Sequence, residues 1–180
     1  VDQVKFQGDK KLIEIIGPEM DRDFLHDVHT LSLSPESDKR HSDMKIVYTP
    51  LHGVGTRLTY RSLELWGFNE VIHVPEQDIH NGDFPTVKSP NPENHEALEM
   101  AIEKAKKTGA QIVLAADPDA DRIALAVRDK KGEYQLVNGN QLVMMLLNYI
   151  ITRNAELGRI TGDEYCVKTI VTTETIKRIA

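Results

Sequence analysis

Three aspartates at alternate positions interrupt an apolar stretch of the chain. The segment "VLAADPDADRIALAV" carries Asp117, Asp119 and Asp121, and Arg122 follows them directly. Carboxylates that converge from one loop repel one another unless a cation lies between them. Mg²⁺ prefers oxygen ligands and keeps coordination positions for water or phosphate. The triplet therefore predicts a Mg²⁺ site, and a turn that only solvates its aspartates is the alternative.

Other aspartate-rich loops fit this segment less well. A calcium-binding EF-hand loop that begins at Asp117 requires glycine in place of Arg122 and glutamate in place of Arg128. A phosphatase loop of the haloacid dehalogenase type with the same start has threonine or valine in place of Asp121. A nucleotide-sugar transferase needs only a DxD pair for its metal, so this alternative stays open.

The composition predicts a folded globular chain and argues against two kinds of partner. Of the 180 residues, 40% are hydrophobic and 28% are charged, which suits at least one well-packed core. The net charge of −6 argues against nonspecific binding to nucleic acid or to an anionic membrane. A single cysteine, Cys166, and a first stretch unlike a signal peptide indicate a cytoplasmic location.

Apolar runs and helical spacing predict alternating strands and helices around the aspartates. We expect strands over residues 44–50, 70–76, 111–116 and 164–173, two more within 122–137, and helices over 14–34, 54–68, 92–110, 139–158 and from 172 onward. Asn94 and Gly109 are placed to begin and end the helix over 92–110. Residues 34–43 are polar and predict a linker. This order indicates the α/β class, as a three-layer α/β/α sandwich with a mainly parallel sheet.

Such a sheet places the aspartates where a binding site is expected. Asp117 directly follows the strand over residues 111–116. Ligands of α/β sheets gather beyond the carboxyl ends of the strands. Pro118 disfavours a helix here, which leaves a tight loop that turns the three carboxylates toward one point.

Three further side chains are candidates for phosphate or substrate contact. Arg122 is a permanent planar cation that pairs either with phosphate oxygens or with the aspartates it follows. His52 lies in "TPLHGVG", where glycines allow close backbone approach, and it either touches substrate or braces the loop. Lys88, in "TVKSPNPE", is either a phosphate-binding cation or a solvated surface residue.

Four segments together resemble one enzyme family. Residues 117–122 match the metal-loop pattern D-x-D-x-D-R of the phosphohexomutases, the phosphoglucomutase and phosphomannomutase superfamily. "TPLHGVG" and "FPTVKSPNPE" resemble two loops of that family's second domain, and "GNQLVMMLL" resembles the entry to its third. The resemblance implies that residues 1–43 are the tail of the preceding domain and a linker, 44–137 are the α/β/α domain II, and 138–180 begin domain III.

The resemblance also implies a reaction. Family members are intramolecular phosphotransferases that interconvert a sugar 1-phosphate with its 6-phosphate, or a pentose 1-phosphate with its 5-phosphate. A phosphoserine gives its phosphoryl group to the sugar, the bisphosphate intermediate reorients, and the other phosphate returns to the serine. Asp117, Asp119 and Asp121 are the implied Mg²⁺ ligands, a phosphoserine oxygen completes the coordination, and Arg122, Lys88 and His52 are the implied phosphate and substrate contacts.

Three loops of the family do not occur in these 180 residues. They are the catalytic serine loop, T-A-S-H-N-P, the sugar-recognition loop, G-E-E-x-S-G, and the serine- and threonine-rich phosphate loop of the fourth domain. The chain also begins at a valine and stops early in a predicted helix. We therefore expect a fragment that supplies the metal loop and is inactive alone, with a sugar phosphate substrate and the missing domains of the same chain as its partners.

Two alternatives from other functional classes stay open. A nucleotide-sugar transferase would use the aspartates as a DxD metal site and should bind a uridine-diphosphate sugar. A non-catalytic metal-binding or phosphosugar-binding module would need no serine loop. The matches in "HGVG" and "TVKSPNPE" favour the mutase.

Overall fold

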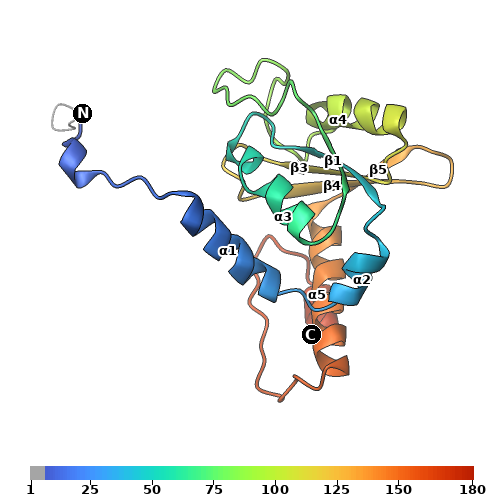
Figure 1. The fold of residues 1–180 in the computed structure, drawn as a ribbon. Helices are drawn as coiled ribbons and strands as arrows, with labels where there is room; N and C mark the ends of the chain where they lie inside the picture. The colour runs from blue at the N-terminus through green and yellow to red at the C-terminus, as the bar shows by residue number, and fades with distance from the viewer. Residues whose placement is uncertain (1–6) are drawn as a thin grey trace.

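A mixed β-sheet organises the chain. The computed structural model describes residues 7–180, so the first six residues of the predicted tail lie outside the described part. Within residues 7–180, a five-stranded sheet has the strand order β2-β1-β3-β4-β5 (Figure 1). The strands are β1 (Lys45–Thr49), β2 (Glu70–His73), β3 (Ile112–Ala116), β4 (Ile123–Arg128) and β5 (Tyr134–Val137).

Four of the five described strands run in one direction. β1 pairs in parallel with both β2 and β3, whereas β4 is antiparallel to both of its neighbours, β3 and β5. The prediction of a mainly parallel sheet is therefore confirmed, with β4 as the exception. β3 and β4 form a hairpin whose last pair, Ala116 and Ile123, brackets the loop that carries the aspartates.

Helices cover both faces of the sheet. The side chains of successive strand residues point to opposite faces of the sheet. Val47 and Val113 therefore face a core shared with helix α4 (His95–Thr108). Tyr48 and Leu114 point to the opposite face, where they pack with Tyr60 of helix α3 (Thr59–Leu65). Figure 1 shows α4 and α3 on opposite sides of the strands. The three-layer α/β/α arrangement expected from the sequence is thus present.

The boundaries of α4 follow from its end residues. Gly109 ends the helix at φ +72°, a left-handed conformation that glycine adopts without steric cost, as predicted. Asn94 is the residue before the helix, but its side chain makes no capping hydrogen bond. Its backbone carbonyl oxygen instead accepts a hydrogen bond from the N–H of Ala97.

The remaining helices precede or follow the sheet in the sequence, except η2, which lies between β1 and β2. They are η1 (Lys10–Leu12), α1 (Pro18–Thr30), α2 (Pro35–Arg40), η2 (Val54–Thr56), α5 (Gly139–Glu156) and α6 (Ile176–Ile179). Asp21 of α1 forms ion pairs with Arg57 and Arg61, which attaches α1 to α3. Asn138 and Gln141 form a reciprocal capping box that starts α5. None of these helices in the described part of the chain is long and apolar enough to cross a membrane.

Three expectations are corrected. The predicted linker over residues 34–43 contains α2, because Pro35 occupies a first-turn position and acidic residues precede basic ones along the helix. The predicted helix over 54–68 is divided into the 3₁₀ turn η2 and the shorter α3. The strand over 164–173 is absent: with no strand beside this segment to pair with, Val167 and Ile170 are exposed.

Candidate metal centre

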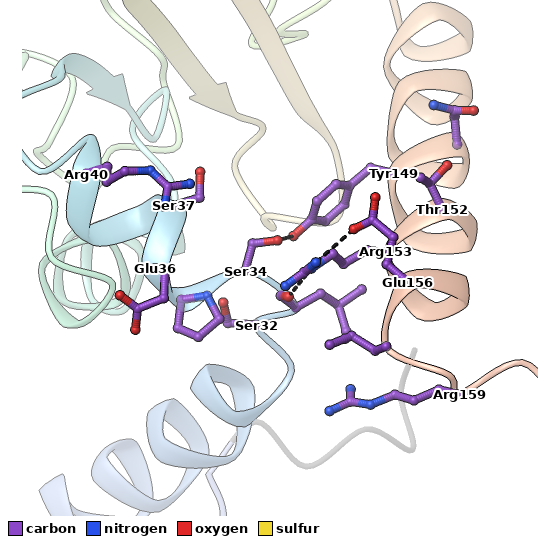
Figure 2. Close-up of a pocket in the computed structure, with 14 residues that line it drawn as sticks. Ser32, Ser34, Glu36, Ser37, Arg40, Tyr149, Thr152, Arg153, Glu156 and Arg159 are labelled. Carbon is purple, nitrogen blue, oxygen red and sulfur yellow. Dashed lines mark hydrogen bonds and ion pairs between the residues drawn. The ribbon is translucent and has the colours of Figure 1, made fainter.

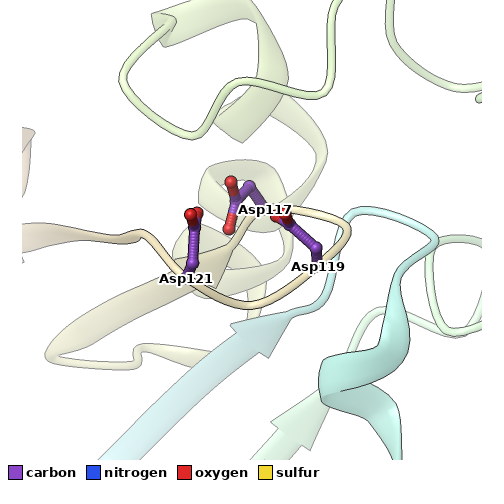
Figure 3. Close-up of side chains that lie close together, drawn as sticks. All are labelled: Asp117, Asp119 and Asp121. Carbon is purple, nitrogen blue, oxygen red and sulfur yellow. The ribbon is translucent and has the colours of Figure 1, made fainter.

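The three aspartates share the tight turn between β3 and β4. The N–H of Ala120 donates a hydrogen bond of 3.0 Å to the carbonyl oxygen of Asp117, and Ala120 has a φ of +61°. This left-handed residue reverses the chain, so Asp117, Asp119 and Asp121 come from one short loop (Figure 3). One carboxylate oxygen of each residue lies within 4.8 Å of those of the other two.

This donor set fits a hard divalent cation. Opposite ligands in an octahedral Mg²⁺ site are about 4.2 Å apart, since each Mg–O distance is about 2.1 Å. The three carboxylate oxygens, which lie within 4.8 Å of one another, are spaced close to this distance. Asp117 is 1% exposed, whereas Asp119 and Asp121 are open to solvent. An ion here would have one buried ligand and two exposed ligands, with an open side toward solvent.

Arg122 is bonded to the buried aspartate. Its backbone N–H donates to Asp117 Oδ1 over 2.9 Å, and its Nε donates to Asp117 Oδ2 over 2.7 Å. Burial acts to raise the pKa of Asp117, but these two hydrogen bonds, together with a hydrogen bond from Asp121 and the charge of Arg122, hold the pKa below its ordinary value. Asp117 is therefore ionised and oriented by Arg122, one of the two roles considered for this arginine.

Negative charge accumulates at the other two carboxylates. The hydrogen bond with Asp117 and the charges of Asp119 and Asp117 raise the pKa of Asp121. Arg122 Nε lies 3.7 Å from an Asp121 oxygen, which offsets this repulsion only in part. A divalent cation between the three carboxylates would relieve the remaining repulsion.

The glycines of "HGVG" bring a second loop against the aspartate loop. The N–H of Val54 donates a hydrogen bond of 2.8 Å to the carbonyl oxygen of Pro118. A Cβ atom on Gly53 would lie 2.2 Å from Pro118 Cα, which is closer than any real contact. Only glycine at position 53 therefore permits the approach of these two backbones.

His52 braces this second loop. The side chain is buried, with Nδ1 2.9 Å from the carbonyl oxygen of Ile79 and Nε2 2.8 Å from Thr86 Oγ1. A carbonyl only accepts, so Nδ1 carries the hydrogen and Nε2 accepts from the Thr86 hydroxyl. Gln77 Nε2 donates in turn to Thr86 Oγ1 over 3.1 Å. Both ring nitrogens are thus used within the protein, which is the loop-bracing interpretation of His52.

A pocket of about 570 Å³ lies beside the aspartates. Asp117, Asp119 and Arg122 line one part of it, and Ser89 and Asn91 line another. Residue type and spacing point to neither Ser89 nor Asn91, although both lie in the segment "TVKSPNPE".

Lys88, the candidate from that same segment, does not line this pocket. Its side chain is exposed and forms an ion pair of 3.0 Å with Glu96 of α4. The bond with Glu96 raises the pKa of the Lys88 ammonium. Lys88 and its neighbour Ser89 thus differ in whether they line the pocket, and sequence spacing alone does not show this difference.

A larger cavity, of about 720 Å³, lies away from the aspartates. It lies between the segment around α2 and helix α5. Figure 2 shows two contacts between these segments. Tyr149 donates its hydroxyl hydrogen to Ser34 Oγ over 2.8 Å, and Arg153 Nε donates to the Leu33 carbonyl oxygen over 2.8 Å. These contacts attach α5 to the segment that precedes the sheet.

The fold and the site define an α/β/α domain with an acidic loop at the carboxyl end of its sheet. The alpha/beta/alpha domain II of phosphoglucomutase/phosphomannomutase matches residues 22–132. The chain belongs to the phosphoglucomutase/phosphomannomutase family. The family predicted from the motifs is thereby confirmed.

Individual relatives agree with this family. The chain is 39% identical over 160 residues to a protein of Schizosaccharomyces pombe named "Probable phosphoribomutase", and 36% identical over 139 residues to a phosphoglucomutase of Staphylococcus aureus strain USA300. These matches cover 87% and 77% of this chain but 26% and 24% of the relatives, so the chain spans about a quarter of their length.

A solved structure shares the fold. It is a phosphoglucomutase/phosphomannomutase family protein from Burkholderia thailandensis, with a TM-score of 0.53 and 21% sequence identity. The match covers 78% of this chain and 33% of the other.

Proposed function

We propose that this chain is the metal-binding part of a phosphohexomutase-type isomerase that transfers a phosphoryl group within a sugar phosphate. The observation that carries the proposal is the convergence of Asp117, Asp119 and Asp121 beyond the carboxyl end of strand β3, in a domain of this family. The family assignment favours the mutase over a nucleotide-sugar transferase. Because one relative is named a phosphoribomutase and another a phosphoglucomutase, both pentose and hexose phosphates are candidate substrates.

The aspartates and Arg122 have different roles in this proposal. In this proposal Asp117, Asp119 and Asp121 hold Mg²⁺, which when bound neutralises negative charge on the transferring phosphoryl group. Arg122 orients Asp117 through Nε, and its terminal nitrogens are available to phosphate oxygens on the exposed side of the loop. His52 holds the neighbouring loop, which contains Gly53 and Val54, in place through its buried hydrogen bonds.

The domain assignment and the partners belong to the same proposal. Residues 1–43 are the tail of domain I with a linker, 44–137 are domain II, and 138–180 begin domain III. The sugar phosphate and the missing domains of the chain are its partners, and those domains carry the phosphoserine. The single cysteine, Cys166, supports a cytoplasmic location.

Metal binding tests the proposal directly. We expect Mn²⁺, used as a paramagnetic substitute for Mg²⁺, to bind the chain with a Kd on the order of 1 mM, because the phosphoserine ligand is missing. Asp119→Asn should weaken binding at least about tenfold, since it removes one charged ligand and leaves the Asp117–Arg122 contacts intact. NMR line broadening of the loop amide signals measures both affinities.

A matched variant controls for the general effect of charge. Asp129 lies in the turn between β4 and β5, and Asp129→Asn removes the same charge while retaining the oxygen that accepts from the Lys131 and Glu133 N–H groups. This variant should bind Mn²⁺ as the unmodified chain does. Equal affinity in all three proteins would refute the metal site.

A turnover assay tests whether the chain is active without the phosphoserine domain. The chain alone should not convert glucose 1-phosphate, even with Mg²⁺ and added glucose 1,6-bisphosphate, because no phosphoserine loop occurs in its sequence. Measurable turnover that Asp119→Ala abolishes would show instead that the chain contains a complete active site.

A further inference from the structure

Ser89 and Asn91 line the pocket beside the aspartates, and both side chains carry hydrogen-bond donors. Both belong to the segment between β2 and α4, and both line the pocket together with Asp117, Asp119 and Arg122. The pocket is thus lined by segments that are separate in the sequence. The aspartates and Arg122 supply charged groups, residues 89–91 supply two neutral polar side chains beside Pro90, and Val54 comes from a third segment.

The orientation of the Asn91 side chain is fixed. Its Oδ1 accepts a hydrogen bond of 3.0 Å from the N–H of Glu93, and its backbone carbonyl accepts one of 3.0 Å from the N–H of Asn94. Because Oδ1 is turned back toward the chain, Nδ2 is the end of the amide left for other partners. No bond to Nδ2 is present among the described residues.

That amide nitrogen is open to solvent. Among the described residues, no buried side-chain nitrogen or oxygen of a half-buried or buried residue lacks a hydrogen-bond partner. Asn91 is half-buried and its Nδ2 has no partner, so Nδ2 itself must be accessible. Ser89 is exposed, and its hydroxyl likewise has no bond within the described part of the chain.

Arg122 adds a positive charge beside these donors. Its Nε is bound to Asp117, whereas its side chain is 53% exposed and no bond from the two terminal nitrogens is present among the described residues. Amide, hydroxyl and guanidinium groups are all donors, and their natural ligand is an oxyanion. A divalent cation and Arg122 would together balance the three carboxylates, and the cation would offer open coordination positions to an oxygen of the anion.

We propose that Ser89 and Asn91 bind the non-bridging oxygens of a phosphate monoester whose other oxygen faces the metal. This inference rests on the proposed function, because the three aspartates repel a phosphate unless a cation neutralises them. The ligand is either the phosphate of the sugar substrate or the phosphoserine of the missing domain, since both present the same dianionic group.

The experiment uses the ¹⁵N-labelled 180-residue chain with and without saturating Mg²⁺. Titration with inorganic phosphate should shift the side-chain amide signals of Asn91 saturably in the presence of Mg²⁺, with a Kd on the order of millimolar. Without Mg²⁺ the shifts should be absent. Parallel titrations with glucose 1-phosphate and with O-phosphoserine distinguish the two sources, because the tighter ligand is the one the pocket selects.

Two variants test the named side chains. Asn91→Asp keeps the oxygen that accepts from Glu93 and replaces the donor with a second carboxylate oxygen. It should weaken phosphate binding, measured at the Arg122 backbone amide, by at least about tenfold. Ser89→Ala removes an exposed hydroxyl with no bond in the described chain, and we expect about threefold weaker binding.

Asn94→Asp is the matched control. It adds the same charge three residues further on, at a position outside the pocket, and should leave phosphate affinity unchanged. Unchanged affinity in Asn91→Asp, or equal losses in Asn91→Asp and Asn94→Asp, would overturn the inference. Mn²⁺ broadening of the same samples separates the two proposals: metal binding without phosphate binding refutes only the role of Ser89 and Asn91, and loss of both refutes the proposed function.

Discussion

The N–H of Val54 donates a hydrogen bond of 2.8 Å to the carbonyl oxygen of Pro118, which joins two loops at the carboxyl ends of strands β1 and β3. Pro118 lies between the first and second aspartates of the metal loop, and Val54 follows the braced residues His52 and Gly53. The position of the carboxylates therefore depends on a loop that contributes no carboxylate of its own.

This contact makes Gly53→Ala a disruptive substitution. The φ of Gly53, −102°, suits any residue, so its cost comes from the added Cβ, which would lie 2.2 Å from Pro118 Cα and 2.3 Å from the Pro118 carbonyl oxygen. We expect a loss of about 3 kcal/mol in the free energy of unfolding, at the upper end for overpacking. Urea denaturation measures this change, and Mn²⁺ affinity should fall with it.

Gly82→Ala is the control for Gly53→Ala. A Cβ on Gly82 meets no atom within 4 Å, so its effect should be within about 0.5 kcal/mol. Equal stability of the two variants would show that the two loops separate easily.

Mg²⁺ should raise the thermal stability of the chain. At a concentration about ten times a millimolar Kd, binding to the folded state adds about 1.4 kcal/mol. This corresponds to a Tm increase of about 4 °C for a chain of this size. Differential scanning fluorimetry should show the increase in the unmodified chain and not in Asp119→Asn, with NaCl of equal ionic strength as the reference.

Tyr60 should contribute more to stability than an exposed tyrosine does. Its hydroxyl lies 2.7 Å from Asp78 Oδ1 and 3.0 Å from the Tyr48 carbonyl oxygen, and burial raises its pKa, so it remains a donor. Tyr60→Phe leaves both acceptors without this donor and should cost about 2 kcal/mol in unfolding free energy.

Tyr149→Phe provides the comparison for Tyr60→Phe. It removes the hydrogen bond to Ser34 shown in Figure 2, but Tyr149 is 43% exposed and water replaces the lost partner. We expect a change under about 0.5 kcal/mol. Similar losses in the two phenylalanine variants would contradict the importance of the buried Tyr60 hydroxyl.

The C-terminal helix should be sensitive to acid. Hydrogen bonds from Lys168 and then Lys177 lower the pKa of Glu174 from 4.5 to about 2. A lowered pKa stabilises the folded state above the unfolded value of 4.5, and this contribution is lost as the pH falls through about 2. NMR titration of the Glu174 carboxyl carbon should therefore show a midpoint near 2.

Removal of one lysine tests the cause of this shift. Lys168→Met should move the Glu174 midpoint upward toward 4.5, because its ammonium is the larger cause of the lowered pKa. Lys131→Met removes an equal charge from the turn between β4 and β5 and should leave the midpoint unchanged. A midpoint that both substitutions move equally would indicate a general charge effect.

Strands and helices with strong local signals were predictable from the sequence. The apolar run at Ile112–Ala116 is buried in the sheet, and Gly109 ends the helix before it in the left-handed conformation that its residue type allows. The alternating aspartates after this strand also predicted three converging carboxylates, because both strands of the hairpin constrain the loop.

Other features depend on contacts that no local pattern contains. Residues 164–173 are rich in β-branched residues, but a strand requires a neighbouring strand and none lies beside them in the described structure. The Arg122–Asp117 bond and the pocket positions of Ser89 and Asn91 depend on side-chain direction within loops. The motif pointed to the segment that contains these two residues, but its candidate Lys88 forms an ion pair with Glu96 and does not line the pocket.

The buried brace around His52 has a consequence for how the site can be altered. Its hydrogen bonds reach Gln77, Ile79 and Thr86, and none extends into residues 87–93, which contain no helix or strand. The aspartates, by contrast, lie in a hairpin held by paired strands on both sides. Residues 87–93 can therefore be exchanged for another sequence, with the buried Pro92 retained, to test whether this segment determines which ligand the pocket accepts while the metal loop keeps its shape.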